Sequence, residues 1–166
     1  MLKQQLCQLC QATETLNRHS LLYGNDPTQA NGRLCRGQRV FCSDRGQRGG
    51  CGRTYAIFLA EVLPRHTVSA TWLWKLLCAL LKKSSVRAAA QALRLPFGLE
   101  TLYHLLARLR LHLDEVRSVL FRQQKPPDSS SSDPLVQTAE HLQSVFAKSS
   151  CPIQEFQAHL QRPFLA

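Results

Sequence analysis

The stretch VFCSDRGQRGGCGRTY, residues 40–55, decides how the first part of this chain folds. The apolar pair Val40-Phe41 precedes one cysteine, and a β-prone run over residues 54–58 follows another. Glycines between the two cysteines permit tight turns in which backbone amides can point at sulfur. We therefore expect the flanks of this stretch to pair as antiparallel strands, with both cysteines on the loop side.

A second pair of cysteines lies far upstream in a C-x2-C arrangement, CQLC at residues 7–10. Two thiolates at this spacing reach one ion from a single turn, and Zn²⁺ in structural sites takes four such ligands in a tetrahedron. A cytosolic chain with clustered cysteines is more often metal-binding than disulfide-bonded. The sequence predicts one structural zinc ion held by Cys7, Cys10, Cys42 and Cys51.

The pair Cys42 and Cys51 departs from the usual C-x2-C knuckle because eight residues separate the two cysteines. His19, in the expected strand after the first knuckle, and Cys35, in the expected insertion, are therefore kept as alternative ligands. A catalytic zinc ion is less well supported, because it needs an open position and usually a carboxylate base nearby. We expect no enzymatic activity.

Seven of the eight glycines lie between residues 24 and 52, and this part of the chain has little periodic apolar pattern. A segment of this kind usually needs disulfides or a bound metal ion to fold. Residues 1–65 are thus predicted to form a zinc-ribbon-like β module.

The character of the chain changes after residue 65. Between Ser69 and Arg122 there is one glycine and one proline, and leucines recur at helical spacing from residue 73 to 81 and from residue 102 to 113. Ser69 and either Ser84 or Ser85 are suited to cap helices. We expect three helices within residues 66–124, the third either continuing to residue 120 or breaking near residue 112.

The second and third of these helices resemble a helix-turn-helix, although the turn is about two residues longer than usual. Ala89 and Ala90 would let the helices approach closely, and the third helix would read base edges. A basic loop after Cys42 is the other nucleic-acid candidate. The predicted contacts are Arg45, Arg48, Arg53, Arg87, Arg94, Thr101, Tyr103, His104, Arg108 and Arg110.

Residues 125–134 have the composition of a linker, and residues 135–166 are predicted to form a C-terminal helix and tail suited to self-association. The net charge is +10, with +5 in residues 1–65, +7 in residues 66–125 and −2 beyond. This surplus favours an anionic partner, with nucleic acid as the first candidate and an anionic membrane surface as the second. The 11 acidic residues supply carboxylate catalysis poorly.

The order of these motifs resembles the zinc-ribbon/helix-turn-helix proteins of bacterial insertion sequences, which are small regulators or N-terminal parts of transposases. The resemblance covers about residues 5–115. It implies a structural zinc ion and binding to transposon-end or promoter DNA. The nuclease domain of such transposases is carboxylate-bearing, and this chain has no room for it, so an accessory or regulatory protein is expected.

We therefore expect an α+β fold and a non-catalytic, zinc-containing DNA-binding protein, with a transposase as a further partner. No small-molecule substrate is expected. Without an apolar signal core or membrane-length span, the expected location is the bacterial cytoplasm, at the nucleoid. An RNA-binding zinc-ribbon protein and a protein-interaction adaptor of a transposition or transcription complex are the alternatives.

Overall fold

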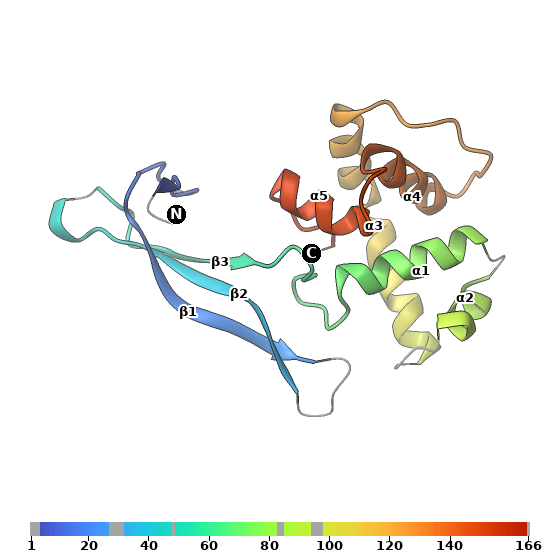
Figure 1. Cartoon of the computed structure of the whole chain (residues 1–166), viewed down its shortest axis with the longest axis horizontal. Coiled ribbons are helices and arrows are strands. Elements are labelled where there is room, and N and C mark those ends of the chain that lie inside the picture. The colour runs from blue at the N-terminus through green and yellow to red at the C-terminus, as the bar shows by residue number, and fades with distance from the viewer. Residues whose placement is uncertain (1–3, 27–31, 48, 83–84, 94–97, 166) are drawn as a thin grey trace. The chain divides into compact units, whose positions relative to one another are not determined.

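The computed structural model describes residues 4–26, 32–47, 49–82, 85–93 and 98–165. In these residues a three-stranded antiparallel sheet precedes five α-helices (Figure 1). The chain divides into two compact units, residues 1–59 and residues 60–166. The α+β class expected from the sequence agrees with this architecture.

The sheet has the order β1-β2-β3, with β1 over Leu16–Asn25, β2 over Arg33–Cys42 and β3 over Thr54–Phe58. Strands β1 and β2 pair along their full length, from Leu16 opposite Cys42 to Asn25 opposite Arg33. Strand β3 pairs only with residues 37–41 of β2, which confirms the return pairing expected around residues 40–58.

The buried core of the first unit is small. It consists of Cys7, Leu16, Val40 and Cys42, with Cys10, Cys51 and Tyr55 partly buried against them. Most members are thiols, so apolar burial contributes little to the stability of this unit. This small core agrees with the little apolar patterning seen in residues 1–60 of the sequence.

The helices of the second unit are α1 (Ala70–Lys82), α2 (Val86–Leu93), α3 (Leu99–Gln123), α4 (Pro134–Val145) and α5 (Pro152–Leu160). The Ser69 hydroxyl accepts a hydrogen bond from the Trp72 amide, and the Ser85 hydroxyl accepts one from the Ala88 amide, both at 3.2 Å. These bonds confirm Ser69 and Ser85 as helix caps. Helix α3 continues past residue 112 without a break.

One hydrophobic core holds all five helices together. Leu73 of α1, Leu102 of α3, Leu142 of α4 and Phe156 of α5 all belong to it. The structure therefore places the expected helical domain at 66–124, the linker and the tail in one unit. The apolar faces of α4 and α5 pack inside it, so self-association through a C-terminal helix would need another surface.

Gln157 of α5 forms hydrogen bonds with both the first and the last described parts of this unit. Its side-chain Nε2 donates to the carbonyl oxygens of Ala60 (2.5 Å) and Val62 (3.1 Å), and its Oε1 accepts from the Phe164 amide (3.0 Å). The rings of Phe156 and Phe164 meet edge to face beside it, with centroids 5.5 Å apart. No described helix combines the length and apolarity that crossing a membrane requires.

Candidate metal site and nucleic-acid surfaces

The structure brings together the four cysteines that the sequence singled out. Cys7 and Cys10 come from the turn before β1, Cys42 ends β2, and Cys51 lies just before β3. Their Sγ atoms all lie within 4.8 Å of one another, so they can hold one metal ion.

The sulfur separations match a tetrahedral thiolate site. Cys7 Sγ lies 3.8 Å from Cys51 Sγ, and Cys10 Sγ lies 3.7 Å from Cys42 Sγ. Four thiolates at about 2.3 Å from a central zinc ion would be about 3.8 Å apart. A disulfide needs a sulfur separation of about 2.05 Å, and all four cysteines are free.

The first pair is shaped by a turn that closes on itself. The Gln11 amide donates to the Cys7 carbonyl (2.8 Å), and the Cys7 amide donates to the Ala12 carbonyl (3.0 Å). Gln11 takes a left-handed backbone conformation, with φ of 60°, to reverse the chain. The Leu9 amide then points at Cys7 Sγ from 3.4 Å, where it stabilises a thiolate.

The second pair depends on a close backbone approach at Gly50. A Cβ added there would lie 1.9 Å from the Ser43 carbonyl oxygen and 3.1 Å from Cys42 Sγ. This approach lets the Cys51 amide donate to Cys42 Sγ at 3.3 Å. The long spacing between the two cysteines is thus taken up by a loop that leaves the cluster and returns, as the glycines suggested.

The pKa values of Cys7 and Cys10 are shifted in opposite directions. Burial raises the pKa of Cys7, but hydrogen bonds from the amides of Leu9 and Cys10 and from neighbouring thiols lower it to about 7. For Cys10 the Ala12 amide lowers the pKa, whereas burial and the neighbouring cysteines raise it to about 11. Four close thiolates repel one another, and a bound divalent cation removes that penalty.

Thr15 is a member of this site that sequence reasoning missed. It is fully buried, its Oγ1 lies 3.2 Å from Cys42 Sγ, and its carbonyl accepts from the Ser43 amide at 2.8 Å. A hydroxyl beside a metal-ligand sulfur restrains the ligand without binding the ion. The spacing of the cysteines does not point to Thr15, because Thr15 meets Cys42 only when distant parts of the chain are folded together.

The two alternative ligands lie outside the cluster. His19 is exposed on β1, with its Nδ1 3.3 Å from the Ser20 hydroxyl. Cys35 is exposed on β2, with its Sγ 3.6 Å from the Gly37 carbonyl. Cys35 lies within a paired strand, so the expectation that it belongs to an insertion is wrong.

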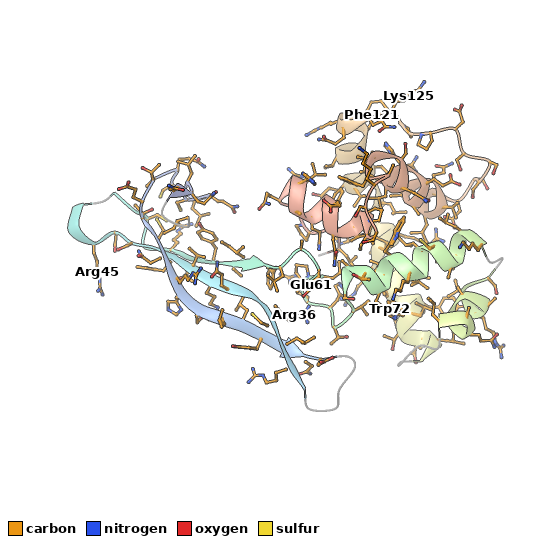
Figure 2. The ribbon with its side chains drawn as sticks, viewed as in Figure 1. Arg36, Arg45, Glu61, Trp72, Phe121 and Lys125 are labelled. Atoms are coloured by element: carbon orange, nitrogen blue, oxygen red, sulfur yellow. The ribbon has the colours of Figure 1, made fainter. Side chains whose placement is uncertain are left out.

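All the described residues proposed to contact nucleic acid are solvent-exposed. They are Arg45 (labelled in Figure 2) and Arg53 in the first unit, Arg87 on α2, and Thr101, Tyr103, His104, Arg108 and Arg110 on α3. Arg48 and Arg94 lie outside the described residues. So does the turn at residues 94–97, although Ala89 and Ala90 of α2 are buried as a close helix contact requires.

Two of the predicted contacts on α3 have partners within the protein. The Arg110 guanidinium donates to both carboxylate oxygens of Asp133, at 2.8 and 3.0 Å. His104 Nε2 lies 3.7 Å from the Glu100 carboxylate. Arg110 therefore belongs to the scaffold of the helical unit, whereas Arg108, two residues earlier, stays available on the surface.

The fold and the site together define an α+β protein with a four-cysteine candidate metal centre and basic surfaces on both units. No protein-family model, curated protein or solved structure matches the chain.

Proposed function

We propose that this chain is a non-catalytic, zinc-containing DNA-binding protein that acts as a regulator or accessory factor of a transposon. The observation that carries the proposal is the four-thiol cluster in a unit whose other fully buried apolar side chains are Leu16 and Val40. Four sulfur ligands leave no open position for substrate, so the ion is structural, and thiolates of this number and spacing suit zinc.

Binding to DNA is supported by charge and by the surface of α3. The chain carries ten more basic than acidic residues. Thr101, Tyr103, His104 and Arg108 are exposed along the first turns of α3, and Arg87 is exposed on α2. Residues on the N-terminal turns of a recognition helix are those that reach base edges in the major groove. The transposon association rests on the order of motifs in the sequence.

The test is selection of the zinc-loaded protein on a random pool of duplex DNA at near-physiological salt. We expect an enriched motif, and we expect Arg108→Ala to relax the preference at one position of it. Arg110→Ala is the matched control, since it removes the same charge from the same helix at a residue held by Asp133. Binding without any enriched motif would contradict sequence reading.

A protein-interaction adaptor is the second candidate, and one observation favours it. Leu111 and Phe121 project from α3 with exposed fractions of 83% and 64% (Phe121 is labelled in Figure 2). Single exposed apolar residues are ordinary, but two this open on one helix suit a protein contact. Replacing both with serine should leave DNA binding intact and abolish association with a partner if α3 is the adaptor surface.

A further inference from the structure

The hairpin of β1 and β2 extends well past the third strand. Strand β3 ends its pairing at Gly37, opposite Phe58, whereas β1 and β2 remain paired to Asn25 and Arg33. The end of the hairpin, where residues 23–25 pair with residues 33–35, is therefore two-stranded, as Figure 1 shows beyond the end of β3. We call the whole β1–β2 hairpin the ribbon, and its inner part, beside β3, is three-stranded.

The charge on the strands of this ribbon has one sign. Its two strands carry Arg18, Arg33, Arg36 and Arg39 together with His19, and neither strand contains an aspartate or glutamate. Arg18, Arg33 and Arg39 are exposed. These four arginines, with Asp26 as the one acid between them in the sequence, give the ribbon a net positive charge.

The outer part of the ribbon has no hydrophobic core. The buried core of the unit ends near the cysteine cluster, where Leu16 pairs with Cys42, and Arg18 pairs with Val40, the outermost residue of that core on β2. Farther out, Leu21, Tyr23 and Leu34 are 55%, 51% and 48% exposed. The Arg33 guanidinium lies over the Tyr23 ring, 5.7 Å from its centroid. Apolar and cationic side chains thus stand together on an uncovered ribbon.

The strand pairing also twists the ribbon. The register shifts between Arg18 and Ser20 and again between Leu22 and Tyr23. Bulges of this kind increase the right-handed twist of a strand pair. A twisted two-stranded ribbon fits the major groove of B-DNA, which is about 12 Å wide.

We propose that the β1–β2 ribbon is a second DNA-binding surface. Its two-stranded end, which carries Arg33, lies in a groove of duplex DNA, and Arg18 and Arg39 on its inner, three-stranded part contact the flanking phosphates. The inference rests on the proposed DNA-binding function. Because phosphate contacts carry no base information, the ribbon supplies affinity and register while α3 supplies sequence preference.

The first test compares two full-length zinc-loaded variants that lose the same charge. One carries Arg18→Gln, Arg33→Gln and Arg39→Gln; the control carries Lys75→Gln, Lys125→Gln and Lys148→Gln, at exposed positions of the helical unit. The slope of log K against log salt should fall by about 3 for the ribbon variant, about one per phosphate contact, and by less than about 1 for the control. Bound zinc, measured per chain, shows that the ribbon variant is folded.

The second test needs no substitution, because the ribbon carries its own probe. Cys35 is exposed on β2 opposite Tyr23, while the metal ligands are shielded by zinc. Saturating duplex DNA should slow alkylation of Cys35 by iodoacetamide at least about tenfold.

The outcomes separate the two proposals. If the wild-type chain binds DNA, but the ribbon variant has the control's slope and Cys35 reacts at an unchanged rate, the ribbon proposal is overturned and DNA binding stands. If the wild-type chain does not bind duplex DNA, both proposals fail. Ribbon effects seen with single-stranded RNA and not with duplex DNA would likewise overturn the assignment to DNA.

Discussion

Arg110 and Asp133 join two helices through a two-pronged ion pair. The guanidinium of Arg110, in the middle of α3, contacts both carboxylate oxygens of Asp133, at 2.8 and 3.0 Å. The same carboxylate caps α4, because its Oδ1 accepts a hydrogen bond from the Leu135 amide at 2.9 Å. One arginine therefore fixes where α4 begins relative to α3.

Replacing this arginine should cost stability and leave DNA affinity almost unchanged. For Arg110→Ala we expect a loss of about 1 kcal/mol in the free energy of unfolding, the upper range for a partly exposed pair with ideal geometry. Urea unfolding of the helical unit, followed by circular dichroism at 222 nm, measures it. Arg108→Ala, at an exposed position outside this ion pair, should lie within about 0.5 kcal/mol of wild type.

The contribution of Asp133 should depend on pH in a defined direction. The hydrogen bond from Arg110 lowers the pKa of Asp133, and the Leu135 amide adds to this effect. A carboxyl with a lowered folded-state pKa stabilises the fold above its unfolded pKa of about 3.9, and this is lost as pH falls through the folded value.

Asp133→Asn isolates the charge, since asparagine still caps a helix. The stability difference between wild type and this variant should be constant above about pH 5 and should shrink below about pH 4. A difference that grows on acidification would contradict the ion pair as its source. Urea midpoints at a series of pH values supply the measurement.

Local patterns predicted much of this fold, because the residues that determine them are close in sequence. The C-x2-C turn, the strands around residues 40–58 and the caps at Ser69 and Ser85 follow from short-range rules. The clustering of the two cysteine pairs is a long-range feature, yet it was predicted, because a structural zinc ion needs four ligands. The structure places all four cysteines together.

What sequence reasoning missed depends on contacts between distant residues. Arg110 meets Asp133 across 23 positions, and Thr15 meets Cys42 across 27. The helices after residue 134 were expected to form a separate tail, yet their apolar faces complete the core beneath α1 and α3. Helical periodicity shows that a face is apolar, but it does not show which neighbour covers it.

Cys42 and Cys35 lie on the same strand and should differ sharply when changed. Cys42→Ser removes one of four clustered sulfurs, so it should lower zinc affinity more than about 100-fold, since loss of an outer-shell group alone costs about 10–100-fold. Cys35→Ser, at an exposed position outside the cluster, should keep wild-type affinity. Competition with a chromophoric chelator measures both, and equal affinities would refute the ligand set.

Removing the metal should affect the two units unequally. Zinc binding and folding are coupled in small modules, and the first unit has a core made largely of the ligands themselves. Excess chelator should therefore abolish slow amide exchange in β1 and β2, while α1 and α3 keep their protection. Hydrogen exchange with mass spectrometry resolves the two regions. An equal loss of amide protection in both would contradict a first unit that the metal stabilises on its own.

Gly50 should tolerate no side chain. Gly50→Ala places a Cβ against the Ser43 carbonyl and near Cys42 Sγ, so the loop must move and withdraw the Cys51 amide from sulfur. We expect zinc affinity to fall by about tenfold or more, the equivalent of a strain of about 1–3 kcal/mol. Gly46→Ala, in the same loop with open space around it, brings only the strain of its left-handed backbone (φ 66°) and no clash at the cluster, so it should lower zinc affinity less in the same chelator competition.

The contacts of Gln157 set an order of events during synthesis. The carbonyls of Ala60 and Val62 are synthesised almost a hundred residues before their hydrogen-bond donor, Gln157. Phe164 must also be synthesised before the Gln157 side chain can form all of these hydrogen bonds. The four sulfurs, by contrast, are all present once residue 51 has left the ribosome. At about 5–20 residues per second, a metal ion that binds the four sulfurs would have several seconds to organise the first unit while the helices are still being translated.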